Sequence, residues 1–155
     1  MSADLFDVEL EPDDDDAPGY RVRYRRVGPL VGGEQLGLTV YELTPGESIC
    51  PYHYENAEEE WLIVLGGRPT LRTPDGEREL GPWDCAFFPM GEEGAHKVTN
   101  RTDETVRVCI WSNRLSVGTT VYPDSDKVGA WPPGKLFRIG DAVGYFDGEV
   151  EPAGD

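Results

Sequence analysis

Apolar residues recur along this chain in short runs of strand length rather than at the spacing of a long helix. Residues 106–112 (VRVCIWS) alternate with period two, so Val106, Val108 and Ile110 share one face of a predicted strand. Residues 61–65 (WLIVL) form a continuous apolar run, which is typical of a central strand covered on both faces. Turn residues separate such runs at intervals of about eight to twelve residues. The pattern predicts an all-β protein, built as an antiparallel sandwich or small barrel.

Turn chemistry helps to place the other strands. Pro74, Asp75 and Gly76 supply a preset φ, a side-chain turn acceptor and a positive-φ residue in the order that a tight turn requires. We therefore expect a hairpin over residues 68–80. Further strands are predicted at residues 20–27, 35–43, 85–88 and 117–121.

Composition divides the chain into three parts. Residues 1–19 include the acidic run DDDD and cannot bury enough apolar surface to order themselves, so we expect a disordered tail. Residues 20–122 carry the predicted strands and form the barrel. Residues 123–155 are expected to be a loop-rich C-terminal extension, with Pro132 and Pro133 in its first half. Its aromatic side chains are expected to be buried: Trp131, Phe137, Tyr145 and Phe146.

Charge and cysteine content narrow the classes of function. The 155 residues carry a formal net charge of -16, which opposes binding to nucleic acid or to an anionic membrane surface. Cys50, Cys85 and Cys109 form no Cys-x-x-Cys pair, so we expect buried thiols in a reducing compartment rather than disulfides or a thiolate zinc site. The N-terminus is acidic where a secretory signal is basic and then apolar. We therefore expect a cytoplasmic protein.

The candidate chemistry is concentrated in two segments. His53 and Glu55 are strand neighbours on one face, and Glu60 on the following strand can converge with them on one point. The chain has two histidines, and the second, His96, lies in residues 89–100 (PMGEEGAHKVTN). Glu59 is an alternative to Glu60, because only one of these adjacent side chains can point inward from a strand. A metal site is predicted, although two histidines satisfied as polar core residues remain the alternative.

These two segments resemble the two motifs of the cupin superfamily. For the first motif, G-x5-H-x-H-x3/4-E-x6-G, the corresponding residues are Gly46, His53, Glu60 and Gly67. For the second motif, G-x5-P-x-G-x2-H-x3-N, they are Pro89, Gly91, His96 and Asn100. The departures are one extra residue after Gly46, two extra residues before His96, and Trp83 where the second motif begins with glycine. Glu55 occupies the position of the family's second motif-one histidine.

The resemblance implies both the fold and the ligand set. Cupins are double-stranded β-helix (jelly-roll) barrels, and their metal is typically held by three histidines and a glutamate. The corresponding set here is His53, Glu55, Glu60 and His96, and it would hold one divalent transition metal, Fe, Mn, Ni or Zn. If Glu55 turns away, the other three residues still provide two imidazoles and a carboxylate. The small single-domain cupins that the chain resembles also lead us to expect a homodimer.

Several functions are compatible with such a site. We expect metal-dependent chemistry on a small oxygenated organic molecule, with oxidation slightly preferred to isomerisation or decarboxylation. In a dioxygenase-like version Glu55 is a weak fourth ligand or proton acceptor, and in an isomerase- or decarboxylase-like version Glu55 moves the proton. A non-catalytic barrel that binds or senses a small ligand is the alternative from another class. A metal-free epimerase-like cupin, with His53 or His96 as a base, is the third.

Overall fold

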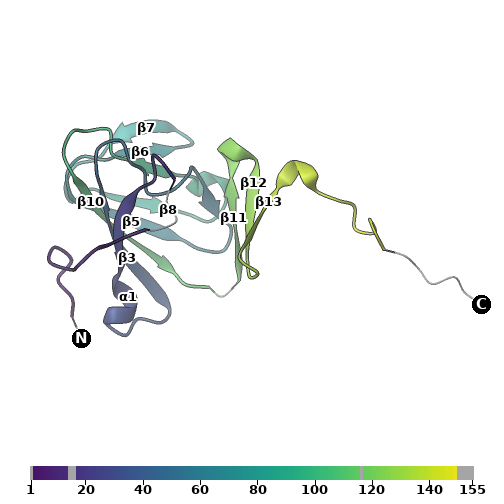
Figure 1. Cartoon of the computed structure of the whole chain (residues 1–155), viewed down its shortest axis with the longest axis horizontal. Helices are drawn as coiled ribbons and strands as arrows, with labels where there is room; N and C mark the ends of the chain where they lie inside the picture. The colour runs from purple at the N-terminus through teal and green to yellow at the C-terminus, as the bar shows by residue number, and fades with distance from the viewer. Residues whose placement is uncertain (1, 14–16, 116, 150–155) are drawn as a thin grey trace, which may run out of the picture.

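The computed structural model describes residues 2–13, 17–115 and 117–149, and strands dominate it (Figure 1). The described strands form three sheets. The largest sheet holds, in spatial order, β1 (Glu11–Pro12), β2 (Val22–Arg26), β3 (Leu36–Leu43), β10 (Val106–Asn113), β5 (Glu60–Gly66) and β8 (Cys85–Phe88). The predicted all-β class is confirmed, and residues 61–65 lie in an interior strand as expected.

A second sheet packs across the first and encloses the core. Its strands are β7 (Gly76–Glu79), β6 (Thr70–Thr73) and β9 (Lys97–Thr99), so the hairpin predicted over residues 68–80 is present. Val106 and Val108 of β10 point into this core, as their alternation predicts, and both are fully buried. The other buried members of this cluster come from both sheets: Val22, Leu43, Leu62, Val64, Leu71, Leu80, Ala86, Phe88 and Val98.

The N-terminal segment differs from the tail expected over residues 1–19. Leu10 is buried with Val40 and Cys109 on the outer face of the large sheet, and β1 extends that sheet beside β2. The Arg107 guanidinium donates hydrogen bonds to the backbone oxygens of Phe6 and Val8. Apolar residues that alternate with the acidic ones pack on this face of the sheet. The expectation of a disordered tail is therefore wrong for residues 4–12. The run of aspartates extends into residues 14–16, which lie outside the described residues.

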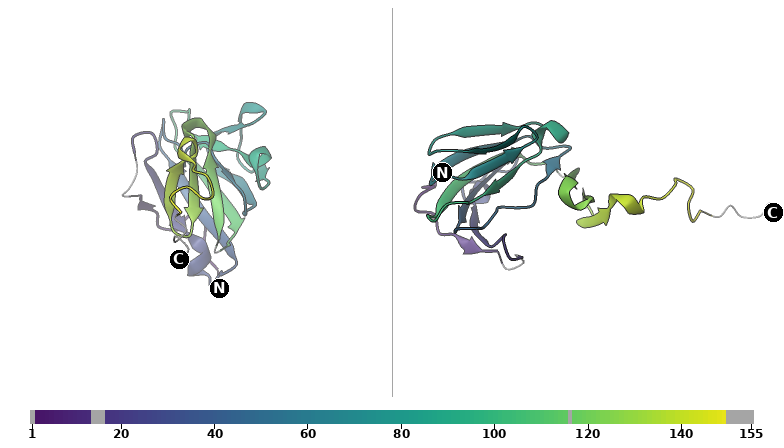
Figure 2. Two further views of the ribbon diagram at one scale, coloured as in Figure 1. Left: turned by 90° about the vertical axis from the view of Figure 1, so that its right-hand side faces the viewer. Right: turned by 90° about the horizontal axis from the view of Figure 1, so that it is seen from above.

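The third sheet is formed largely by the C-terminal part of the chain. Its order is β13 (Lys135–Arg138), β12 (Lys127–Trp131), β11 (Gly118–Tyr122) and β4 (Tyr54–Glu55). The loop expected after residue 122 is therefore wrong for residues 127–138, where Pro132, Pro133 and Gly134 join two paired strands. In Figures 1 and 2 this sheet stands at one end of the barrel, and the chain beyond it runs away from the body.

The expectation that the aromatic residues of the extension are buried is also wrong. Phe137 is 50% exposed, Tyr145 is 90% exposed and Phe146 is 77% exposed, while Trp131 is 39% exposed. The arm that carries Phe137, Tyr145 and Phe146 extends away from the barrel (Figure 2), and the described part of the chain leaves at least half of each of these side chains exposed, whereas Trp131 donates a hydrogen bond to Thr120. The helical segments are short: α1 (Val27–Leu30), η1 (Glu92–Gly94), η2 (Pro123–Ser125) and η3 (Ile139–Asp141). Among the described residues, none of these segments has the length and apolar character needed to cross a membrane.

Candidate metal centre

The two histidine-bearing segments are joined directly by their backbones. The His53 N–H donates to the His96 carbonyl oxygen at 3.2 Å, and the His96 N–H donates to the His53 carbonyl oxygen at 2.8 Å. This isolated antiparallel bridge brings together two residues that are far apart in sequence. The imidazole rings lie side by side, with centroids 4.7 Å apart. Both side chains are buried, so the pair faces the interior at one end of the barrel.

Backbone carbonyls fix the tautomer of each imidazole. His53 Nδ1 lies 3.0 Å from the Pro51 carbonyl oxygen, and His96 Nδ1 lies 2.9 Å from the Gly94 carbonyl oxygen. A carbonyl oxygen only accepts hydrogen bonds, so each Nδ1 carries the proton and each Nε2 carries a lone pair. A carbonyl on the far nitrogen is the arrangement that usually orients a metal-binding histidine. Both Nε2 atoms are thus free to act as ligands.

Glu60 supplies the third group. Its Oε2 lies 3.5 Å from His96 Nε2 and 3.9 Å from His53 Nε2. The three ligand atoms are within 4.8 Å of one another. Glu60 Oε2 is buried and has no hydrogen-bond partner. Among the described residues, one other buried side-chain atom also lacks a partner. Because a buried carboxylate oxygen normally has a partner, this oxygen indicates a site for a cation.

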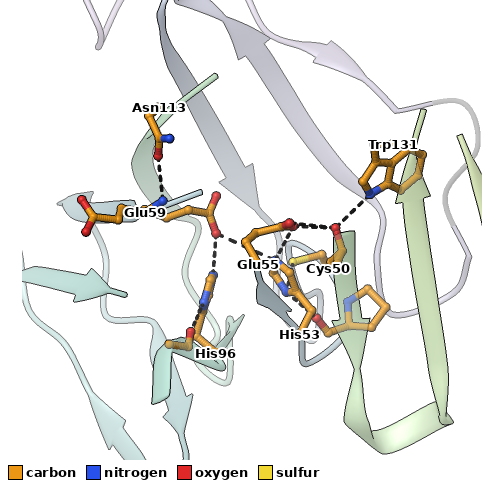
Figure 3. Close-up of polar contacts among 11 residues, drawn as sticks. Cys50, His53, Glu55, Glu59, His96, Asn113 and Trp131 are labelled. Carbon is orange, nitrogen blue, oxygen red and sulfur yellow. Dashed lines mark hydrogen bonds and ion pairs between the residues drawn. The ribbon is translucent and has the colours of Figure 1, made fainter. Parts of the chain in front are cut away.

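The structure distinguishes Glu60 from the adjacent Glu59. Glu59 is exposed and its backbone N–H donates to Asn113 Oδ1 at 2.7 Å. Figure 3 shows the Glu59 side chain directed away from the two histidines. Strand alternation at the start of β5 therefore turns Glu60 inward and Glu59 outward.

Burial determines the protonation of the cluster. It lowers the pKa of His96 to about 3, with the neighbouring His53 adding to the effect, and it also lowers the pKa of His53. Burial raises the pKa of Glu60 to about 7, and the Glu55 and Glu58 carboxylates raise it further. At neutral pH both imidazoles are therefore uncharged ligands, while Glu60 is poised to ionise when a cation arrives.

Glu55 is held beside this cluster rather than within it. Its Oε1 lies 4.0 Å from His53 Nε2, but the carboxylate accepts a hydrogen bond from the Thr120 hydroxyl at 2.7 Å. Trp131 Nε1 donates to the same Thr120 oxygen at 2.9 Å, which commits the hydroxyl proton to Glu55 (Figure 3). Burial raises the pKa of Glu55, and the Thr120 hydrogen bond partly opposes this. A carboxylate oriented in this way can exchange a proton with a molecule bound next to the cluster.

Aromatic rings form two walls of the site. Phe88 stacks on His96 with centroids 3.7 Å apart, and Tyr122 stacks on His53 with centroids 6.0 Å apart. Other aromatic residues close in sequence lie elsewhere, because Trp61 stacks on Trp111 and also packs against Phe87 on the large sheet. Phe88 and Tyr122 thus limit how the imidazoles can rotate.

Sequence reasoning missed several contributors to the site. Thr120 and Trp131 come from the C-terminal sheet, where Thr120 pairs with Glu55 across β11 and β4. Cys50 Sγ lies 3.5 Å from His53 Nδ1, although its sequence context gives no sign of this. The expectation of three buried thiols is wrong for Cys85, which is exposed. Neighbours separated by 65 residues, such as Thr120 and Glu55, leave no local pattern to detect.

The residues present fit a divalent transition metal. Two neutral imidazoles and one carboxylate form a nitrogen- and oxygen-rich donor set, which suits Fe, Mn, Ni or Zn. His53, Glu60 and His96 would hold the ion, and Glu55 lies close enough to join them or to act on a bound molecule. Of the four predicted ligands, the structure therefore brings three together and anchors the fourth to Thr120.

Comparison with known proteins identifies the barrel. A sequence profile described as "Cupin domain" matches residues 39–113, from within β3 to the end of β10. This protein contains a cupin domain. The resemblance seen in the two motifs is thus confirmed, and the all-β fold is the cupin barrel. A curated relative, the dimethylsulfoniopropionate lyase DddQ of Ruegeria pomeroyi, is 27% identical over 100 residues, which are 64% of this chain and 48% of the lyase. The chain thus matches about half the length of that relative.

Solved cupin-like structures also cover the C-terminal extension. A putative sugar phosphate isomerase from Acidithiobacillus ferrooxidans superposes with a TM-score of 0.81 at 25% identity, covering 90% of this chain and 90% of that chain. A sugar phosphate isomerase of the cupin superfamily from Silicibacter pomeroyi superposes with a TM-score of 0.80 at 26% identity, covering 95% and 98%. The shared structure therefore exceeds the cupin barrel and includes most of the third sheet.

Proposed function

We propose that this cupin is a metal-dependent enzyme that moves a proton on a small oxygenated organic molecule, as an isomerase or a lyase does. His53, Glu60 and His96 hold one divalent metal, and Glu55 is the proton carrier. The observation that supports the proposal most strongly is the convergence of two free Nε2 atoms on the unpartnered Glu60 Oε2. A bound ion would polarise a carbonyl or carboxylate oxygen of the substrate.

The surroundings of Glu55 favour proton transfer over a purely structural role. Its pKa is raised by burial, so it is a stronger base than an exposed glutamate. Thr120 and Trp131 fix its direction. In an isomerisation the carboxylate takes a proton from a carbon next to the carbonyl and returns it to the neighbouring carbon. In an elimination the same first step is followed by departure of a leaving group.

The similar proteins support this class of reaction. Two solved structures at 25% and 26% identity are named as sugar phosphate isomerases, one of them as putative, and the curated relative is named as a lyase. Isomerases and lyases both need a group that takes up a proton near a polarised oxygen. This chain offers Glu55 in that role.

Metal content gives the first test, because the chain offers a matched pair of variants. We expect protein purified without a histidine tag or chelator to carry about one divalent ion per chain, measured by elemental analysis. Glu60→Gln removes a direct ligand and should lower metal affinity by at least about 100-fold, because loss of a residue that only supports a ligand already costs about 10- to 100-fold. Glu59→Gln should leave the affinity unchanged. Equal metal content in the two variants would refute the assignment.

Solvent exchange tests the proton transfer. Small hydroxy-carbonyl compounds are incubated with the metal-loaded protein in D2O, and deuterium incorporation is followed by NMR. Glu55→Gln should abolish incorporation while the metal content stays at the wild-type level. Incorporation at an unchanged rate in this variant would remove Glu55 from the proposal.

A dioxygenase is the second candidate, because two histidines and one carboxylate also suit non-haem iron with open positions. Oxygen uptake by the iron-loaded protein in the presence of a substrate would favour it. Substrate turnover in the absence of oxygen supports the isomerase or lyase. A small molecule that raises the melting temperature but is never transformed would instead indicate a binding module.

A further inference from the structure

A pocket of roughly 830 Å³ lies directly beside the candidate metal centre. None of the four site residues lines this pocket, but three of its lining residues touch His53 or Thr120, the hydrogen-bond partner of Glu55. Cys50 approaches His53 Nδ1, Tyr122 stacks on the His53 ring, and Trp131 donates to the hydroxyl that binds Glu55. Figure 3 shows Cys50 and Trp131 on the same side of His53 and Glu55. A molecule in this pocket would thus lie against side chains that touch His53 and Thr120.

One of the chain's three lysines lines this pocket, and a second contacts a lining residue. The sequence has three lysines in a chain with a formal charge of -16, and Lys127 lines the pocket. Lys97 lies just behind it, because its Nζ donates to the hydroxyl of the lining residue Tyr20 at 3.2 Å. Both ammonium groups lie over aromatic rings, Lys127 at 5.3 Å from the Tyr122 centroid and Lys97 at 5.0 Å from that of Tyr20.

Neither lysine is neutralised by a carboxylate in an ion pair within the described part of the chain. By contrast, five arginines make such pairs with Asp or Glu: Arg23, Arg25, Arg68, Arg72 and Arg101. The pocket lining contains two carboxylates, Asp13 and Asp124. Arg72 binds both oxygens of Asp124, at 2.5 and 2.9 Å, so the charge of Asp124 is already balanced.

This arrangement selects for negative charge in a ligand. An acid-rich surface repels small anions, so an anionic substrate needs a local positive field to reach the site. A lysine held over an aromatic face is partly desolvated, and it gains when an anion replaces the lost water. Tyr52, Tyr122 and Trp131 add flat surfaces for the organic part of the molecule.

We propose that this pocket binds the anionic group of the substrate, a carboxylate or a phosphate, with Lys127 as the direct contact and Lys97 as a second positive charge behind it. The proposal rests on the proposed function, because it places the other end of the same substrate near Glu55. It also adds a specificity residue from the C-terminal sheet to a site built mainly by the barrel.

Binding of small anions to the protein as purified tests this inference. Glycerol 3-phosphate and propionate serve as the phosphate and carboxylate probes, with glycerol and propionamide as their neutral counterparts. Affinity is measured by ligand-observed NMR titration at low ionic strength. We expect at least one anion to bind and its neutral counterpart to bind about tenfold more weakly or not at all. The probe that binds tells carboxylate from phosphate.

Variants locate the contact. Lys127→Met should weaken binding of the anion about tenfold, and Lys127→Arg should restore most of it. Arg101→Met removes one positive charge outside the pocket lining and should leave the affinity unchanged. The inference is overturned if neither anion binds, if Lys127→Met binds like the wild type, or if Arg101→Met has the same effect.

Metal analysis of the same samples separates this inference from the proposed function. If the protein carries metal but Lys127→Met leaves the affinity for the anion unchanged, the pocket assignment fails and the metal site stands. If anion binding depends on Lys127 but no metal binds even after reconstitution, the pocket assignment stands and the enzyme proposal fails.

Discussion

Glu60 is the residue whose ionisation should govern metal binding. Its pKa in the folded protein is about 7, above the ordinary 4.5, so the folded protein retains a proton there that the unfolded chain has lost. Between about pH 4.5 and 7 this group therefore lowers the stability of the metal-free protein as the pH rises. His96 acts in the opposite direction, because its pKa is lowered to about 3 and its contribution to stability is lost as the pH falls below 6.5. As the pH rises above 7 most Glu60 carboxyls become ionised, and their charge can then be compensated by a cation.

Zinc affinity should consequently depend on pH through Glu60. Below pH 7 a proton competes with the ion for this carboxylate, so we expect the affinity to fall up to about tenfold per pH unit. Competition against a chromophoric chelator between pH 5.5 and 8.5 measures this, after correction for protonation of the chelator. In Glu60→Gln the step near pH 7 should vanish. An equally steep step in that variant would assign the dependence to another group.

At the scale of elements, the C-terminal sheet completes a site that the barrel begins. β11 places Thr120 opposite Glu55 of β4, and β12 brings Trp131 to the same hydroxyl. Thr120 and Trp131 lie outside residues 39–113, which match the cupin profile, whereas Glu55 lies within them. The direction of Glu55 is thus set by a part of the molecule that barrel motifs do not describe.

Thr120→Val tests this coupling with almost no change in volume. Loss of the hydroxyl removes the hydrogen bond that lowers the pKa of Glu55, so this pKa should rise, as followed by carboxyl-carbon NMR. We expect the free energy of unfolding to fall by about 1 kcal/mol, because Trp131 Nε1 loses its acceptor. Metal content should stay unchanged. Thr119→Val is the control, because the Thr119 hydroxyl binds Asn56 instead; the same rise in this control would contradict the coupling.

The elements that the sequence predicted well are those defined by local patterns. The apolar run at residues 61–65, the alternation at residues 106–112 and the turn around Gly76 all correspond to strands or hairpins in the structure. The strands within residues 127–138 were not predicted, because Pro132 and Pro133 favour a loop. In the structure these prolines lie in the turn that joins β12 to β13, and the two strands pair with each other.

The site residues also separate into those that local sequence patterns predict and those that only distant strand pairing brings together. His53, Glu60 and His96 could be found from strand spacing and motif, since both operate over short distances in sequence. Thr120, Trp131 and Lys127 could not, because they reach the site only through pairing between β4 and β11 and between β11 and β12.

At the scale of the whole molecule, the extension leaves apolar surface that this chain does not cover. All residues of the outermost strand β13 are exposed, and Phe137 is half exposed. Residues 127–138 contain three cations and no carboxylate, while the chain as a whole carries -16. We propose that a second copy of this chain covers the arm, because its acidic body complements the basic hairpin. This keeps the homodimer expected from the sequence as a proposal.

Sedimentation velocity tests the dimer. We expect the protein to sediment at twice the chain mass of 17.2 kDa and to dissociate in part at high salt, because the complementary charges are screened. Phe137→Asp should shift the equilibrium towards the monomer by about tenfold or more, whereas Leu30→Asp, at an exposed position on α1, should not. A wild-type protein that stays monomeric at concentrations of about tens of micromolar would contradict the proposal.

The reciprocal backbone bonds between His53 and His96 have a consequence for how an ion is acquired. These bonds use only backbone atoms, so they do not depend on an ion and would keep the two ligand segments together whether or not a metal is bound. Metal uptake by the proposed site would then require no refolding, and one ion could replace another in the native protein. Occupancy would follow intrinsic affinity and supply, which for divalent metals favours the later members of the first transition row. The identity of the metal recovered with the protein would therefore depend on which metals the growth medium supplies.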